Sequence, residues 1–359
     1  MKKVLATILA LVMALSVTTM AWADDVAKIG NTGYATLKEA IEHVANGETI
    51  VLTANVNNGD GIVVASGKNF TLDFAGHTYT ITQNVVGSTG TESQCFQLLK
   101  DSTITMKDGT IVANCAGAKM IIQNYCNLTL DNMILNATAG DNNVEYVVSN
   151  NCGNVVIKNG TTITAKTTGV AFDVYGGFQN YGDVSVTLEA GATVNGKVEV
   201  ARGSGNQNKN TLTVTGGTVN GDLAVTPNAK TEVAVTGGTF SSNVSDYTAD
   251  NAPVASNNGT YYVGEETIQN AANNLSAGQQ LKIEKGAVTI NGAEYRAGGN
   301  ATYTKPSSGG YYYYQPTTDT KTTDTKGSPK TFDAGIALYV GMALTSVAGV
   351  AFVGKKRED

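Results

Sequence analysis

The middle of this sequence repeats one short pattern seven times, and the repeat limits the fold more than any other feature. Each unit begins with two apolar residues separated by one residue, at Leu72/Phe74, Ile104/Met106, Leu128/Leu130, Val155/Ile157, Val186/Leu188, Leu212/Val214 and Val233/Val235. Four positions after the first apolar residue stand Gly76, Asp108, Asn132, Asn159, Ala190, Gly216 and Gly237. An apolar residue then returns at Tyr79, Ile111, Leu135, Ile163, Val194, Val219 and Phe240.

This pattern predicts short strands joined by sharp turns. Alternation of apolar and polar residues indicates a strand with one buried face. Asn, Asp and Gly supply the positive backbone angles that a sharp turn needs. One such unit cannot close a core alone, so successive units must stack on one another. With parallel strands ~4.8 Å apart, seven coils would span roughly 30–35 Å.

The repeat resembles the right-handed parallel β-helix of pectate-lyase-like proteins, and the expected fold is therefore all-β. The intervals between first anchors are 32, 24, 27, 31, 26 and 21 residues, which suits a stack whose turns can swell into loops. The alternative fold is a string of immunoglobulin-like sandwiches. The constant offset of the turn, without hairpin alternation, favours the β-helix.

Both ends of such a stack need caps. Thr36 to Glu39 fits a capping box that opens a short helix, which we expect to end at Gly47, with a first strand over Glu48 to Thr53. At the far end we expect a helix over Glu265 to Leu275, then strands at 281–283 and 287–290. These patterns divide the chain into a β-helix with its N-terminal cap (24–259), a C-terminal cap or small module (260–304) and a polar linker (305–327).

The N-terminus has the features of a secretory signal peptide over residues 1–23. Lys2 and Lys3 precede an uncharged, mainly apolar stretch at residues 4–17. Ala21 and Ala23 fit the small-x-small rule for signal peptidase, which predicts a mature chain that begins at Asp24. The alternative is an uncleaved N-terminal anchor.

Residues 328–359 form a three-part C-terminal segment. Ser328, Pro329, Lys330, Thr331 and Phe332 precede an uncharged apolar run at residues 334–354, and a basic tail follows. The run is long enough to cross a bilayer as a helix, and the basic tail would remain in the cytoplasm.

This segment resembles the cell-wall sorting signal of Gram-positive surface proteins, whose usual motif is Leu-Pro-x-Thr-Gly. The resemblance implies that a sortase cysteine attacks the carbonyl of Thr331 and that an amine of a peptidoglycan precursor resolves the acyl-enzyme. Ser328 replaces the usual Leu and Phe332 the usual Gly, so a dedicated sortase is implied. Without one, the segment would be a plain transmembrane anchor that holds the folded part outside the plasma membrane.

Composition excludes some partners. The two terminal signals hold five of the 24 basic and three of the 30 acidic residues, so the remaining chain has a net charge of −8 and only two arginines, Arg202 and Arg296. Such a surface is a poor phosphate binder, and nucleic acid is not an expected partner. Outside the cell, Cys95, Cys115, Cys126 and Cys152 could form two disulfides in three connectivities, or remain small buried side chains.

No catalytic or cofactor motif stands out. Polysaccharide lyases of the β-helix class need carboxylates with a Lys or Arg base, and hydrolases need clustered aspartates. The aspartates here are scattered along the sequence, at Asp73, Asp101, Asp108, Asp131, Asp173, Asp183 and Asp222. His43 and His77 are isolated, and the chain has no phosphate loop, nucleophile elbow or zinc motif. We therefore expect a protein without catalytic activity, cofactor or metal.

One segment has the composition of a glycan-binding patch. Residues 172–183 combine aromatic residues, among them Tyr175 and Tyr181, with the acidic residues Asp173 and Asp183. Aromatic rings can stack on sugar rings, while polar groups form hydrogen bonds with sugar hydroxyls. Phe178 aligns with apolar residues of other coils and is expected in the core. The expected function is an adhesin-like, wall-anchored surface protein that binds a host or dietary glycan. The alternatives are a polysaccharide lyase or glycoside hydrolase on the same fold, and a structural coat or stalk component.

Overall fold

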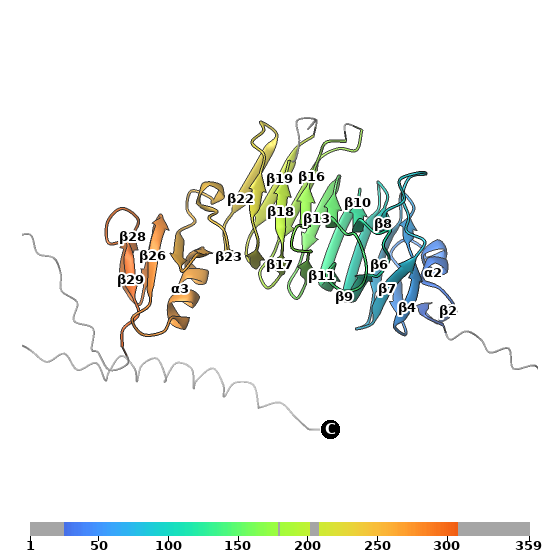
Figure 1. Ribbon diagram of the computed structural model, residues 1–359, viewed down its shortest axis with the longest axis horizontal. Helices are drawn as coiled ribbons and strands as arrows, with labels where there is room; N and C mark the ends of the chain where they lie inside the picture. Colours follow the sequence, from blue (N-terminus) through green and yellow to red (C-terminus); the bar gives the residue numbers. More distant parts are fainter. Residues whose placement is uncertain (1–24, 179, 202–207, 308–359) are drawn as a thin grey trace, which may run out of the picture. The chain divides into compact units, whose positions relative to one another are not determined.

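A computed structural model describes residues 25–178, 180–201 and 208–307 (Figure 1). The predicted signal peptide, most of the linker and the sorting segment lie outside the described residues. In the described part of the chain, neither helix has the length and apolar composition needed to cross a bilayer.

The described chain is nearly all-β, and most of its strands stack in parallel in three columns. The first column runs through β3 (Thr49–Leu52), β6 (Asn69–Asp73), β9 (Thr103–Ala113), β11 (Asn127–Asn136), β13 (Gly153–Ile157), β16 (Val184–Leu188), β19 (Asn210–Val214) and β22 (Thr231–Val235). The second column contains β4 (Val56–Asp60), β7 (Thr78–Gln83), the later halves of β9 and β11, β14 (Thr162–Thr164), β17 (Thr193–Asn195), β20 (Thr218–Asn220) and β23 (Gly238–Phe240).

The third column is a separate parallel sheet. It contains β5 (Ile62–Val64), β8 (Gln94–Leu98), β10 (Met120–Asn124), β12 (Tyr146–Asn150), β15 (Val170–Val174), β18 (Lys197–Val200) and β21 (Leu223–Val225). The sequence pattern did not predict this column, because β8, β12 and β15 are buried at every position and show no alternation. Strands buried on both faces lose the period-2 signal.

The predicted inward positions are buried except for Val233, which is partly buried, and the alignment shows one shift of register. The returning apolar residues from Tyr79 to Phe240 are each at most 3% exposed. In the first coil, however, Leu72 pairs with Met106 and Phe70 with Ile104, so the predicted alignment of Leu72/Phe74 was wrong by two residues. Apolar residues stand at 70, 72 and 74, and all three are buried, so alternation alone could not choose between the two pairs.

The turn between the first two columns changes along the stack. Asp108 and Asn132 have positive φ (56° and 53°), and β9 and β11 continue through the bend. In the next coil the positive φ moves to Gly160 (79°), where an added Cβ would lie 2.5 Å from the side-chain oxygen of Asn132. Close approach between neighbouring coils therefore requires glycine there as much as the backbone angle does.

The N-terminal cap contains two strands that the sequence did not predict and one helix that it did. β1 (Ala27–Ile29) pairs antiparallel with β2 (Thr32–Tyr34) and with β3. In α2 (Leu37–His43), the Thr36 hydroxyl oxygen accepts a hydrogen bond from the Glu39 backbone N–H at 3.1 Å. The helix ends at His43 rather than near Gly47, because Val44 is already extended (φ −60°, ψ 129°).

The C-terminal residues have their own hydrophobic cluster. A single 3-10 turn (Ser245–Tyr247) precedes β24 (Val254–Asn257), β25 (Thr260–Val263), α3 (Glu265–Asn274), β26 (Gln280–Lys285), β27 (Ala287–Ile290), β28 (Ala293–Arg296) and β29 (Thr302–Thr304). The cluster includes Ile268, Leu281, Ile283, Ile290 and Tyr303. The second predicted helix is thus present, and β25 pairs antiparallel with β23 at the end of the parallel columns.

Candidate functional site

Four aromatic rings gather beside the third column. Tyr125 follows β10, and Tyr175, Phe178 and Tyr181 lie in the loop after β15. The ring centroids of Tyr125 and Tyr181 are 4.7 Å apart, and Phe178 lies 5.7–6.0 Å from the other three rings. Phe178 is 39% and Tyr181 36% exposed. We call these four residues the aromatic platform.

Hydrogen bonds hold the loop that carries three of the rings. The side-chain amide of Asn208 donates to the carbonyls of Gly176 and Phe178 at 3.1 and 2.9 Å. Lys100 Nζ donates to the carbonyl of Asn180 at 3.3 Å, and Cys152 Sγ donates to the carbonyl of Tyr181 at 2.7 Å. The loop is therefore fastened to neighbouring coils on both sides, which keeps the exposed rings in place at low entropic cost to binding.

Buried polar groups lie beside the platform on the same sheet. Gln123 Nε2 donates to the Tyr125 hydroxyl at 2.8 Å. Asp173 accepts from the Asn150 backbone N–H at 2.6 Å and from the Ser149 hydroxyl at 3.3 Å. Burial, then Tyr181, then Asp173 raise the pKa of Tyr125 to about 12, so its hydroxyl remains protonated at neutral pH.

The structure separates the predicted contact residues. Tyr175 and Tyr181 each lie beside Phe178, with ring centroids 5.7 and 5.8 Å from the Phe178 ring. Asp173 is only 2% exposed and bonded within the sheet, so its assignment as a direct contact is wrong. Asp183 is exposed and accepts from the Lys209 backbone N–H at 2.8 Å.

Phe178 was expected in the core, and the structure corrects this. The core position of its coil belongs to Phe172, which pairs with Val148 and is fully buried. The loop after β15 lengthens the coil. A position assigned by its distance from the next strand therefore falls in this loop and not in β15. Sequence reasoning also missed Tyr125, although it follows β10 at the position where Tyr175 follows β15, two coils along.

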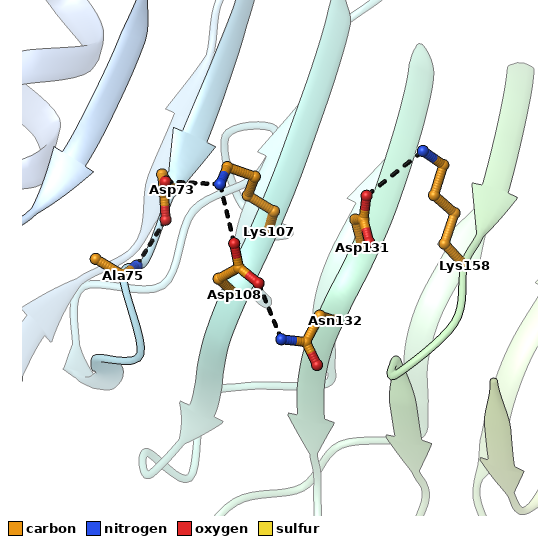
Figure 2. A network of polar contacts seen from close by, with 7 residues as sticks. All are labelled: Asp73, Ala75, Lys107, Asp108, Asp131, Asn132 and Lys158. Atoms are coloured by element: carbon orange, nitrogen blue, oxygen red, sulfur yellow. Dashed lines mark hydrogen bonds and ion pairs between the residues drawn. The ribbon is translucent and has the colours of Figure 1, made fainter. Parts of the chain in front are cut away.

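Some scattered aspartates come together in a second place (Figure 2). Lys107 Nζ lies 2.8 Å from Asp73 and 2.9 Å from Asp108, and Lys158 lies 3.4 Å from Asp131. Hydrogen bonds to the two carboxylates raise the pKa of Lys107, while the hydrogen bond from Asn132 and then that from Lys107 lower the pKa of Asp108. A lysine held protonated in this way is a weak general base, and the network links one coil to the next.

The cysteines are free thiols. Cys95, Cys126 and Cys152 are buried and Cys115 is partly exposed. A hydrogen bond with Cys95 lowers the pKa of Cys115 to about 7. Among the described residues, His, Cys, Asp and Glu form no cluster that could hold a metal ion.

Comparison with known proteins adds no relative to this geometry. No family model, no curated protein and no solved structure matches the chain.

Proposed function

We propose that this protein is a cell-surface, adhesin-like protein whose aromatic platform binds a glycan. The observation that carries the proposal is the exposure of Phe178 and Tyr181 within a cluster of four rings on an anchored loop. Exposed aromatic side chains that a scaffold holds in place are typical of binding sites rather than of packing. The ring faces would stack on the apolar faces of sugars, and Asp183 and the Tyr175 hydroxyl would bond sugar hydroxyls.

The three parallel columns support the finer proposal of a right-handed parallel β-helix. The coils from β3 to β21 contribute to all three columns, and the register passes unbroken from β6 to β22 in the first. A stack of this kind presents its loops at fixed heights, and the platform joins rings from coils two steps apart.

A glycan array with the soluble fragment 24–304 tests the binding proposal. We expect the parent fragment to bind at least one glycan and the double variant Tyr175→Ala, Tyr181→Ala to lose that binding while it keeps its circular dichroism spectrum. The comparison variant Tyr175→Phe, Tyr181→Phe keeps the rings, so it should keep the stacking on the sugar and lose only the hydrogen bond of the Tyr175 hydroxyl. Binding of no glycan by the parent, or equal binding by the folded Ala variant, would refute the proposal.

We propose further that the C-terminal segment anchors the protein to peptidoglycan through a sortase. Thr331→Ala removes the residue whose carbonyl the enzyme would attack, so the variant should stay in the membrane fraction and be absent from detergent-washed cell wall. Lys330→Ala is the matched control, because the motif leaves that position free. Equal wall linkage of Thr331→Ala and parent would leave only a membrane anchor.

A further inference from the structure

A pocket of about 640 Å³ lies between the end of the second column and helix α3. Antiparallel pairing of β23 with β25 joins the two sides of the pocket. A hydrogen bond of 2.9 Å from the Gly264 N–H to the Pro253 carbonyl holds the start of α3. The pocket is separate from the aromatic platform, and none of the platform residues lines it.

One wall of the pocket is a threonine column. Thr193, Thr218 and Thr239 pair in register on successive strands, and all three line the pocket. Strands in a sheet lie ~4.8 Å apart, so the three threonine positions repeat at that spacing. Each side chain is half-buried and makes no hydrogen bond to another described residue.

The other wall carries amide groups and a ring. Asn270 and Asn274 are four residues apart on α3, which places them on one face of the helix. Both line the pocket, together with Tyr262 of β25, and neither Asn side chain bonds to another residue in the described ranges. Free hydroxyl and amide groups therefore meet across the same space.

The chemistry of the lining defines the ligand class. Glu266 is the one charged residue among those that line the pocket, and no cation faces it there. Glu266 would repel an anionic ligand, which would also find no cationic partner in the pocket. A neutral polyol, in contrast, can donate hydrogen bonds to the hydroxyl and amide groups and accept hydrogen bonds from them. Tyr262 adds an aromatic ring to a polar pocket, a combination suited to sugars.

We propose that this pocket binds a neutral oligosaccharide, laid along the threonine column and covered by α3. Successive sugar hydroxyls would bond Thr193, Thr218 and Thr239, and Asn270 and Asn274 would bond the opposite edge. The site is independent of the platform, so the protein would hold glycan at two places.

The test uses the full-length chain in a detergent without a sugar head group. The probes are the uncharged hexasaccharides cellohexaose, xylohexaose, maltohexaose and hexa-N-acetylchitohexaose, titrated by calorimetry. We expect a Kd in the millimolar range or below for at least one of them. Thr218→Val keeps the shape and strand propensity of the side chain and removes its hydroxyl, and Asn270→Ala removes an amide on α3. Each should weaken binding about 3- to 10-fold, the loss of one hydrogen bond.

Two controls separate the pocket from the platform. Thr187→Val removes a similarly half-buried threonine from the first column, outside the pocket, and should bind like the parent. If no probe binds, or if Thr218→Val and Asn270→Ala bind as tightly as the parent, the pocket proposal is overturned. Loss of binding only in Tyr175→Ala, Tyr181→Ala would assign the glycan to the platform alone, whereas loss only in the pocket variants would support the pocket and count against the platform.

Discussion

Neighbouring residues Leu130 and Thr129 give a sharp test of the coil register. Leu130 is fully buried and pairs with Met106 and Ile157 on the two neighbouring strands of the same column. Thr129 points to the other face and is half-buried, between Thr105 and Val156. The two positions are adjacent in sequence, so they differ in the direction of the side chain and not in the local strand.

The same substitution at each position should therefore have very different effects. Leu130→Asp loses the packing of a buried leucine, about 2–5 kcal/mol, and adds the desolvation of an unpaired carboxylate. The sum is on the order of the whole free energy of unfolding of a domain, about 5–15 kcal/mol. Thr129→Asp should cost about 1 kcal/mol or less, mainly through strand propensity.

Urea denaturation of fragment 24–304, followed by far-UV circular dichroism, measures the difference. With a slope on the order of 3 kcal/mol/M, Thr129→Asp should lower the midpoint by roughly 0.3 M, and Leu130→Asp should remove most of the folded baseline. Leu130→Ala, at about 2–5 kcal/mol, gives a variant that can still be titrated, with a midpoint lowered by roughly 1 M. Equal tolerance of Asp at both positions would mean that the inward and outward faces are assigned wrongly.

Three further predictions concern the turns, the platform and the thiols. Gly153→Ala should destabilise the fragment by more than Gly67→Ala. Both glycines have positive φ (84° and 78°), which strains an alanine by about 1–2 kcal/mol, but only a Cβ at 153 meets neighbouring backbone, at 2.4 Å. Similar urea midpoints for the two variants would contradict the close approach of the coils at Gly153. The pKa of Tyr125 is raised to about 12, so the contribution of the protonated phenol to stability is complete below pH 10 and is lost as pH rises from 10 to 12. Tyr125→Phe should therefore flatten the dependence of unfolding free energy on pH in that range. An unchanged slope would show that the phenol is not buried. At pH 7, iodoacetamide should modify Cys115 before Cys126. Cys115 is partly exposed and its pKa is lowered to about 7, whereas burial raises the pKa of Cys126 to about 12. Mass spectrometry that finds Cys126 modified first would contradict the structure.

The sequence predicted the first two columns because their residues alternate. Every returning apolar residue from Tyr79 to Phe240 is buried, and the turn residues at 108 and 132 have the expected positive φ. The third column was not predicted, because strands such as β12 (Tyr146–Asn150) are buried throughout and carry Ser149 and Asn150 inside. Those polar residues are bonded to Asp173, a long-range pairing that one sequence does not reveal.

The candidate site was predicted in part for a similar reason. The aromatic and polar composition of residues 172–183 pointed to the loop, and Tyr175 and Tyr181 do lie near each other there. Composition could not tell which acidic residue faces solvent, and Asp173 proved to be bonded inside the sheet. Tyr125 joins the platform from two coils away, so it becomes visible only when the third column is aligned.

Both proposed binding surfaces depend on coils that stack in parallel and in register, and a distance between two spin labels tests this most directly. Thr49 and Thr213 occupy the same outward column, and the register passes from one to the other through Thr71, Thr105, Thr129, Val156 and Thr187. Six steps of ~4.8 Å predict a backbone separation of about 29 Å. Spin labels introduced through genetically encoded keto amino acids at both positions, and measured by pulsed electron–electron double resonance, should give one narrow distance distribution near that value. The distance between labels at Thr71 and Thr213 should be about 5 Å shorter. A broad distribution, or distances that do not decrease by one step when the label moves by one coil, would contradict the stacked-coil account.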